Sequence, residues 1–393
     1  MATDDEAAEQ IAMRGLLGEV TADLGAPLAR AWEEGFWAVP RHRFLPDRVW
    51  LGDDLAPCDR SADPGRWLGG AYADDSVVTQ LNDGHDPGEG EPWASSSASA
   101  PSIVFRMIDM LDVRSGHRVL EVGTGTGWNA GLLAHRLGAE NVTTVEVDPV
   151  LAVQAALNLK KVGLEPEAIC GDGAAGYAAS APYDRIIATC SVREVPRAWV
   201  EQTRPGGAIL TPWETPWVCY GLVRLVVDAE GLASGWFHPH SAFMLMRNQR
   251  TDLRIFRDVV RDDHQPDESS TTLPPTAVAG DDWAAQFAIG LQTRDVWRAW
   301  HHDPDVVGVA SRLWLATTDA TSWAAVDWDG RSGDRFTVWQ YGPRRLWNEV
   351  EAAHAWWHNV GRPGPERFGL TVAADGTHRP WLDRPDDMVP TTG

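Results

Sequence analysis

Hydrophobic residues up to about position 250 alternate between short continuous runs and helical spacing. A short apolar run after Gly116 ends at Val122 and predicts a buried strand, and the glycines that follow open a helix through Leu132, Leu133 and Leu137. Further helices are predicted over residues 4–24, from near 27 to before 40, and over 103–111, 149–163 and around 199; further strands over 142–146, near 169, at 186–187, and over 217–228 and 235–247. This alternation predicts a doubly wound α/β fold with a parallel sheet, closed by an antiparallel hairpin that turns at residues 228–231.

Three stretches near the first hundred residues show neither a continuous apolar run nor helical spacing of apolar residues. Residues 39–46 are bounded by prolines and predict an extended segment, and residues 47–93 are rich in Gly, Asp and Pro and predict a long irregular loop. The serine cluster at 95–101 is a low-complexity linker by composition alone. Because it directly precedes a helix, its hydroxyls are equally suited to cap that helix or to reach a ligand, and both interpretations stay open.

The pattern changes after Arg250. Residues 251–281 are predicted to be a linker, on the strength of the polar, proline-containing stretch 262–275. Residues 282–393 are rich in tryptophan and predict an α+β accessory domain with an amphipathic helix over 346–357. Most of these tryptophans are expected to build a second core, while one or two exposed rings are suited to a peptide groove. The predicted domains are therefore an N-terminal helical segment (1–46), an α/β domain (47–250), the linker and the accessory domain.

Charge and cysteine content narrow the partners. The 393 residues carry a formal net charge of −22, which disfavours nucleic acid and suits a basic peptide or a small molecule. The four cysteines are scattered, so neither a disulfide framework nor a metal site is expected. The N-terminus is acidic and no apolar run approaches membrane-spanning length, which predicts a cytoplasmic protein with no membrane partner.

The glycines after the first strand predict a ligand-binding loop. Glycines allow a sharp turn and close approach to a ligand, and the N–H groups of the helix that follows favour anionic groups. A dinucleotide fingerprint fails because Trp128 stands where its third glycine belongs. The pattern is instead Glu121-x-Gly123-x-Gly125-x-Gly127, which resembles the first motif of class I S-adenosylmethionine methyltransferases. An ordinary glycine-rich turn is the alternative.

Six motifs occur in the order seen in protein-L-isoaspartate O-methyltransferases, and the chain resembles that family over about residues 27–250. They are VPRHRFLP (39–46), SAP (99–101), LEVGTGTG (120–127), GDG (171–173), APYDRII (181–187) and RPGG (204–207). The resemblance implies a Rossmann-like class I fold that binds S-adenosylmethionine and releases S-adenosylhomocysteine. Beyond residue 250 the chain resembles the C-terminally extended actinobacterial members that modify ribosomally made peptides (RiPPs).

The resemblance also assigns roles to individual residues. Ser99 is the expected catalytic residue, and Ser97 is expected near both cofactor and substrate. Arg193 and Val195 are expected to contact substrate, and the run around Arg193 departs from the small apolar stretch usual in the family. The expected cofactor-binding residues are Ser97, Glu121, Gly123, Thr124, Gly125, Gly127, Asn129, Glu146, Val147, Asp172 and Gly173.

The implied reaction is carboxyl O-methylation of an aspartyl or isoaspartyl side chain in a peptide or protein, followed by succinimide (aspartimide) formation from the ester. A dedicated ribosomally made peptide is the favoured substrate. General isoaspartate repair, a small-molecule carboxyl methyltransferase and a catalytically silent scaffold on the same fold remain the alternatives.

Overall fold

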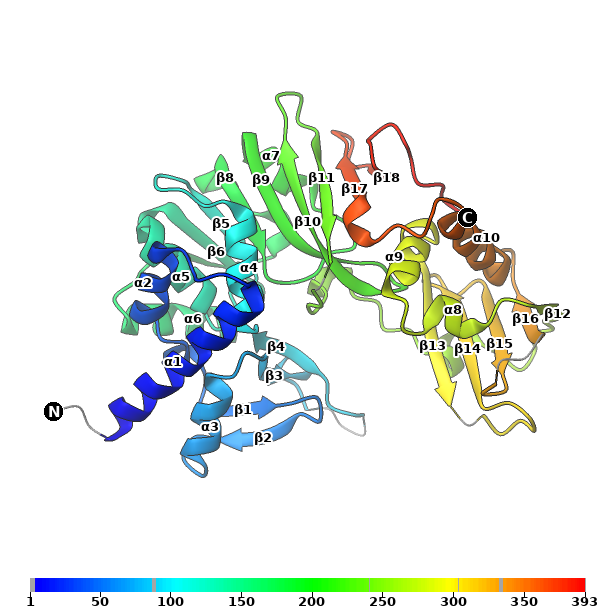
Figure 1. Cartoon of the computed structure of the whole chain (residues 1–393), viewed down its shortest axis with the longest axis horizontal. Helices are drawn as coiled ribbons and strands as arrows, with labels where there is room; N and C mark the ends of the chain where they lie inside the picture. Colours follow the sequence, from blue (N-terminus) through cyan, green and yellow to red (C-terminus); the bar gives the residue numbers. More distant parts are fainter. Residues whose placement is uncertain (1–3, 87–89, 240, 303, 332–334, 393) are drawn as a thin grey trace. The chain divides into compact units, whose positions relative to one another are not determined.

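A computed structural model describes residues 4–86, 90–239, 241–302, 304–331 and 335–392 (Figure 1). The chain divides into two compact units. The first consists of Met1–Cys190, Pro196–Leu210 and Val226–Gly231, and the second of Ser191–Val195, Thr211–Leu225 and Leu232–Gly393. Within the described ranges, no helix combines the length and the apolar character needed to cross a bilayer.

The first unit is built on parallel strands in the order β9–β8–β5–β6–β7. Their bounds are β5 (Val119–Val122), β6 (Val142–Glu146), β7 (Glu167–Cys170), β8 (Tyr183–Ala188) and β9 (Thr203–Glu214), whose residues from Thr211 on are counted in the second unit. Every residue of β5 and β6 is buried, as expected of strands covered on both faces. The predicted parallel α/β layout is confirmed.

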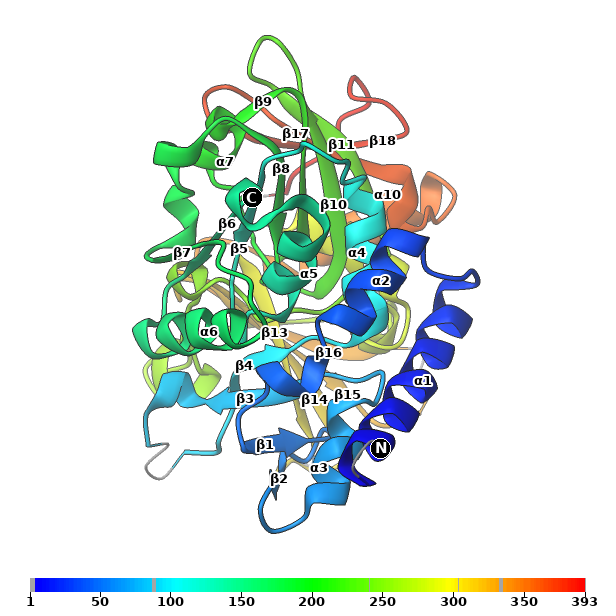
Figure 2. The same ribbon diagram turned by 90° about the vertical axis from the view of Figure 1, so that its left-hand side faces the viewer.

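Helices cover these strands. They are α1 (Asp4–Leu24), α2 (Arg30–Ala38), α4 (Pro101–Leu111), α5 (Trp128–Leu137), α6 (Pro149–Lys161) and α7 (Arg197–Gln202). Both α5 and α6 pack against β6, α2 packs on α5, and α1 packs on α4 (Figure 2). The start of α6 is fixed locally, because Asp148 accepts from the N–H groups of Val150 and Leu151 and Pro149 occupies the first turn.

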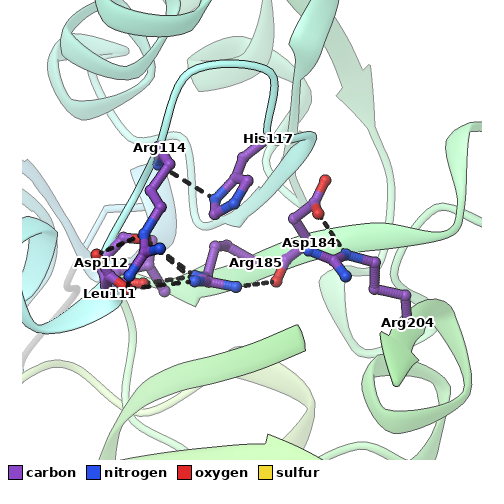
Figure 3. A network of polar contacts seen from close by, with 7 residues as sticks. All are labelled: Leu111, Asp112, Arg114, His117, Asp184, Arg185 and Arg204. Carbon is purple, nitrogen blue, oxygen red and sulfur yellow. Dashed lines mark hydrogen bonds and ion pairs between the residues drawn. The ribbon is translucent and has the colours of Figure 1, made fainter. Parts of the chain in front are cut away.

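An arginine–aspartate network holds the amino ends of the central strands (Figure 3). Arg185, at the start of β8, is buried, and its guanidinium donates to the carbonyls of Leu111, Asp112 and Asp184. The Asp184 carboxylate pairs with Arg204 and accepts from a backbone N–H of the segment before β5. These contacts tie the end of α4 to the starts of β8 and β9.

The predicted loop over 47–93 is wrong, because this stretch forms most of a small antiparallel sheet. The order is β2–β1–β3–β4, with β1 (Arg48–Leu51), β2 (Ala56–Asp59), β3 (Val77–Leu81) and β4 (Ala94–Ala98), and α3 (Pro64–Ala71) follows β2 (Figure 1). The strands are only four or five residues long and are separated by Gly- and Asp-rich turns. Short strands of this kind carry little alternation, so composition hid them.

Two local predictions before α4 also need correction. Residues Arg41–Phe44 form a turn of 3₁₀ helix inside the segment predicted to be extended. The serine cluster is neither a linker nor a cap: Ser95, Ser96 and Ser97 lie in β4, and α4 begins after Ala100 without a side-chain cap. The hydroxyls are therefore left for other partners.

In the second unit, one group of strands has the order β18–β17–β11–β10. The bounds are β10 (Cys219–Val227), β11 (Ala233–His238), β17 (Phe368–Val372) and β18 (His378–Leu382). The neighbours β10 and β11 form the predicted hairpin, but its second strand ends at His238 rather than at 247. Since β17 pairs antiparallel with β11, the predicted boundary near residue 250 does not separate compact units.

The remaining strands of the second unit form an antiparallel sheet in the order β12–β16–β15–β14–β13, with three helices. Its elements are β12 (Asp267–Thr271), α8 (Pro275–Ala279), α9 (Trp283–Gln292), β13 (Val296–His302), β14 (Ser311–Thr317), β15 (Trp323–Trp328), β16 (Phe336–Tyr341) and α10 (Leu346–Asn359). The linker prediction is wrong, because all five residues of β12 pair with β16 and Ile255 and Val259 are buried. Trp314, Trp323 and Trp347 are buried, which confirms the second core.

Candidate active site

The glycine loop leaves the carboxyl end of β5 and reaches α5 at Gly127. The N–H groups of Gly123 and Thr124 donate to the carbonyl of Val145 at 2.9 and 3.3 Å. Gly123 has a φ of +92°, and a Cβ there would lie 2.9 Å from Thr189 Oγ1, so glycine is required. The loop therefore lies against the carboxyl ends of β6 and β8, where open α/β sheets bind ligands.

Glu121 supports this loop from inside the sheet. Its side chain is fully buried, and its carboxyl oxygens accept from Thr144 Oγ1 at 2.5 Å and Asn129 Nδ2 at 2.6 Å. Thr144 Oγ1 also lies 2.6 Å from Thr124 Oγ1. Burial raises the pKa of Glu121 to about 7, because the charged form loses its water. Glu121 was expected to contact the cofactor, and its position is that of a buried support.

Asn129 supplies an acceptor that the protein leaves unused. Its Oδ1 is buried and has no hydrogen-bond partner among the described residues. A buried acceptor in this condition costs on the order of 1–3 kcal/mol unless a bound molecule donates to it. Asn129 lies in the first turn of α5, where backbone N–H groups also favour an anionic group. This end of the loop therefore fits a small molecule that carries both an amine and a carboxylate.

Glu146 ends β6 and faces the loop. Its Oε2 accepts from the N–H of Gly125 at 2.8 Å, and its Oε1 accepts from the N–H of Asp148 at 3.1 Å. Each carboxylate oxygen has a second lone-pair site, so two ribose hydroxyls can still donate to it. Beside it, Val147 is 44% exposed and offers an apolar surface.

Asp172 and Gly173 lie at the turn after β7. Asp172 Oδ1 accepts from the N–H of Ala174 at 2.9 Å, which is the contact of a turn residue that binds its own backbone. The carbonyl of Gly173 accepts from Trp199 Nε1 at 2.8 Å. The N–H of Gly171 donates to the carbonyl of Glu146 at 2.9 Å. The turn is thereby tied to the end of β6, and a further contact to adenine remains a prediction.

Hydrogen bonds connect the serine strand to this edge of the sheet. Ser95 Oγ donates to Gln80 Oε1 at 3.0 Å, and Gln80 Nε2 donates to Asp148 Oδ2 at 2.9 Å. Asp148 and Gly125 then meet on the carboxylate of Glu146. The β3–β4 pair is thus joined to the glycine loop. The sequence analysis did not identify Gln80 or Asp148 as site residues. Asp148 could have been found as the residue before Pro149, where it caps the start of α6.

The loop and the serine strand also approach each other directly. Gly125 has a φ of +54°, and a Cβ there would lie 3.7 Å from the carbonyl oxygen of Ser97 and 3.9 Å from Ser96 Oγ. Ser97 pairs with Val78 across β3 and β4 and is half-buried. Ser99, two residues further on, is also half-buried, and a contact of its hydroxyl with a ligand remains a prediction.

Arg41 fixes the position of Ser99. Its guanidinium is buried and donates to the carbonyls of Ala98 at 3.1 Å and Ser99 at 3.0 Å. It also donates to the carbonyls of Ala71, Ala73 and Asp75. Burial lowers the pKa of Arg41 to about 10, so the side chain stays charged at neutral pH. Arg41 lies in the proline-bounded motif 39–46, which was identified from the sequence. The motif alone did not indicate that Arg41 holds the backbone of Ser99.

Arg193 and Val195 belong to the second unit and are described there alone. Arg193 forms an ion pair with Glu214 at 3.2 Å and donates to Thr251 Oγ1 at 3.2 Å. Its guanidinium is therefore engaged by other residues of the protein. Val195 has a side chain only 2% exposed, and its N–H donates to His378 Nε2 at 2.9 Å. Both contact sets are internal to that unit and give no support to direct substrate contact.

The loop, the acid after β6 and the unused acceptor in α5 together fit S-adenosylmethionine, which carries an amino acid group at one end and a ribose at the other. Comparison with known proteins agrees. The sequence model described as protein-L-isoaspartate(D-aspartate) O-methyltransferase (PCMT) matches residues 87–221.

Individual proteins match over longer stretches. A protein-L-isoaspartate O-methyltransferase of Methanopyrus kandleri is 36% identical over 215 residues, which cover 54% of this chain and 80% of that protein. One from Pyrococcus horikoshii is 41% identical over 152 residues, covering 38% of this chain and 69% of the relative. A solved protein-L-isoaspartate O-methyltransferase shares the fold, with a TM-score of 0.55 at 21% identity over 95% of this chain and all of that one.

These matches confirm the predicted class I methyltransferase fold, the enzyme class and the S-adenosylmethionine cofactor. The chain belongs to the protein-L-isoaspartate O-methyltransferase family of S-adenosylmethionine-dependent enzymes.

Proposed function

We propose that this methyltransferase esterifies the side-chain carboxyl of an aspartyl or isoaspartyl residue in a ribosomally made peptide, and that the ester then closes to a succinimide. The observation that carries the proposal is the link between the serine strand and the glycine loop through Gln80, Asp148 and Glu146. This link favours Ser99 as the hydroxyl that holds the acceptor carboxyl beside the methyl donor.

The chemistry asks the protein for placement more than for proton transfer. A carboxyl group with a pKa of about 4 is already an anion near neutral pH, so no general base is needed to create the nucleophile. S-adenosylmethionine supplies an activated methyl group on a positively charged sulfur. Holding the carboxylate in line with that group contributes as much as roughly 7–11 kcal/mol. In this proposal Ser99 donates a hydrogen bond to one carboxylate oxygen, and Arg41 keeps the backbone of Ser99 in place.

Esterification prepares the second step. The methoxide of the ester is a better leaving group than the oxygen of a free carboxylate, so the following backbone nitrogen attacks the carbonyl, loses its proton and releases methanol. Repair of isoaspartate and deliberate formation of aspartimide share this first step. A dedicated peptide is favoured by the second unit, since the enzyme carries a tryptophan-rich α+β region beyond residues 87–221, the part that the family's sequence model matches.

The test compares two methyl acceptors at equal concentration: linear isoaspartyl peptides of varied sequence, and conformationally constrained peptides that contain Asp. Methyl transfer and the loss of water that accompanies overall imide formation are followed by mass spectrometry. We expect kcat/KM to be higher for a constrained Asp peptide by at least about tenfold, a difference of about 1.4 kcal/mol in transition-state binding. A short peptide gene beside the gene of this enzyme would identify the natural sequence to test.

Two results would contradict the proposal. Robust turnover of generic isoaspartyl peptides, with none of constrained Asp peptides, would indicate general repair. Calorimetric titration with S-adenosylmethionine separates a further alternative, because a silent scaffold binds no cofactor and methylates neither acceptor.

A further inference from the structure

The second unit contains a cavity that is lined entirely by its own residues. Its volume is about 400 Å³, and it opens between α8, the end of β13 and the end of β15. The lining residues are Thr276, Ala279, Gly280, Asp281, Trp300, His302 and Trp328. Three of these seven are aromatic or imidazole rings, one is a carboxylate, and none is Lys or Arg.

The ring walls are held in fixed positions. Trp300 and Trp328 meet at 61° with centroids 6.2 Å apart, and His302 stacks on Trp300 at 12° and 6.3 Å. Trp300 Nε1 donates to the carbonyl of Ala279 at 2.9 Å, and His302 Nδ1 lies 3.0 Å from Ser311 Oγ. Both tryptophans are only partly buried and pack on the hydrophobic core of this unit. Their orientation is therefore set before any ligand arrives.

The charge at the rim selects the ligand. Asp281 is exposed, and its carboxylate has no hydrogen bond or ion pair within the described ranges of the chain. Two indole faces present negative electrostatic potential, and a carboxylate adds a full negative charge beside them. The whole chain, at −22, attracts cations over longer distances. Apolar walls alone would accept any apolar side chain, whereas this combination favours a cation.

We propose that this cavity binds a cationic side chain, guanidinium or ammonium, presented by a polypeptide. Its volume exceeds that of a lone cationic group and falls in the range of pockets that enclose a larger ligand, which favours a side chain with flanking backbone. The inference does not depend on which carboxyl group the enzyme methylates. It assigns to the tryptophan-rich region a recognition function for basic sequences.

The test measures binding of three probes to the full-length protein by isothermal titration calorimetry. They are the pentapeptide acetyl-Gly-Gly-Lys-Gly-Gly-amide, the same peptide with norleucine in place of lysine, and free methylammonium. We expect the lysine peptide to bind at least about tenfold more tightly than the norleucine peptide, because the two differ only in the ammonium group. Methylammonium should bind at least about tenfold more weakly than the lysine peptide, because it lacks the stem and backbone.

Matched variants locate the site. Asp281→Asn should weaken binding of the lysine peptide roughly 3- to 10-fold and Trp300→Leu roughly 3- to 30-fold. Asp386→Asn and Trp283→Leu change an exposed acid and an exposed indole outside the cavity, and should leave the affinity unchanged. Asp281→Asn alters a surface group, so it reports on binding even if Trp300→Leu fails to fold.

Three results would overturn the proposal. Equal affinity for the norleucine peptide would make the cavity an apolar pocket. Equal affinity for methylammonium would make it a site for a free small cation. Lysine-peptide binding that is absent at 10 mM, or unaffected by Asp281→Asn, would show that this cavity does not recognise cationic side chains.

Discussion

The two ends of the parallel strands in the first unit use charged groups in opposite ways. At the amino ends, Asp112 and Asp184 pair with arginines, and Arg185 saturates three backbone carbonyls (Figure 3). At the carboxyl ends, Glu121 and Glu146 receive their hydrogen bonds from a hydroxyl, an amide and backbone N–H groups. Ion pairs close the amino ends of β8 and β9, and neutral donors hold the acids at the carboxyl ends of β5 and β6.

This difference separates a structural end from a functional one. A carboxylate satisfied by an arginine has little left to offer a ligand. Carboxyl groups held by neutral donors keep spare lone pairs, and a hydroxylated or amine-bearing ligand can use them. The unused Asn129 Oδ1 lies at the same end. Substitutions at the amino ends should therefore change stability, and substitutions at the carboxyl ends should change cofactor binding, catalysis or pH dependence.

The largest effect is expected at the amino ends, for Arg185→Met. Loss of this buried guanidinium leaves the carbonyls of Leu111, Asp112 and Asp184 short of donors, and we expect the free energy of unfolding to fall by about 3–5 kcal/mol. Urea denaturation measures it. Arg114→Met is the control, since its side chain is 70% exposed and its pair with Asp112 is worth less than about 1 kcal/mol.

The affinity of folded Arg185→Met for S-adenosylmethionine should stay within about threefold of the parent, a difference below about 1 kcal/mol. A large loss of cofactor affinity with normal stability would erase the distinction between the two ends.

Glu121→Gln tests the carboxyl end through pH. Because burial raises the pKa of Glu121 to about 7 from 4.5, the folded state binds a proton more tightly than the unfolded state. This contribution is fully present below about pH 4.5 and is lost as pH rises through 7, up to about 3 kcal/mol in total. Glu121→Gln should remove that decline. Unfolding free energies at pH 5 and pH 8, measured without cofactor, check it, and an unchanged slope in the variant counts against a buried neutral Glu121.

Glu146→Ala should weaken binding of S-adenosylmethionine about 10- to 100-fold, or about 1.4–2.8 kcal/mol, because the hydrogen bonds to its carboxylate include a charged partner. Calorimetric titration measures the affinity. The matched control is Glu140→Ala, an acid of the same first unit placed before β6 rather than after it. An affinity loss equal in both variants would mean that long-range charge, and not a direct contact, attracts the cofactor.

The smallest effect is expected for His117→Asn, at the amino end of β5. Burial and then the Arg185 guanidinium lower the pKa of His117, so the unfolded state takes up a proton first as pH falls. The parent should therefore lose stability as pH falls below 6.5, and the variant should lose less. His117 and Glu121 lie at the two ends of β5, and they should change the free energy of unfolding with pH in opposite directions. Denaturation of the parent and both variants over one pH series measures both effects. Slopes of the same sign would contradict the assigned burial of one of them.

The sequence predicted the parallel sheet, its helices and the glycine loop because those elements carry long, regular patterns. Val119–Val122 is a continuous apolar run, and α6 has both an Asp cap and an initial proline. The small β1–β4 sheet was missed because its strands are short, and β12 was missed because its sequence, Asp-Glu-Ser-Ser-Thr, has no buried face until its last residue. Propensity and composition say little where pairing with a distant strand decides the structure.

The supports of the site were equally hard to predict. Arg41 and Gln80 act through contacts with residues 30 to 68 positions away, and no local pattern encodes such distances. Glu121 was identified by its motif, but only its burial shows that it braces the loop. The run around Arg193 departs from the family pattern, and Arg193 was therefore expected to contact substrate. No local pattern indicated its ion pair with Glu214, a residue of another strand.

The central claim is that Ser99 holds the acceptor carboxyl beside a cofactor bound on the glycine loop. Ser99→Ala, with Ser115→Ala as control at the opposite end of the strands, tests it directly when kcat/KM for a peptide acceptor and Kd for S-adenosylmethionine are measured together. We predict a fall in kcat/KM of roughly 100-fold or more, with Kd changed less than about threefold, in Ser99→Ala alone. Full activity in Ser99→Ala, or an equal loss of cofactor binding, would contradict the claim.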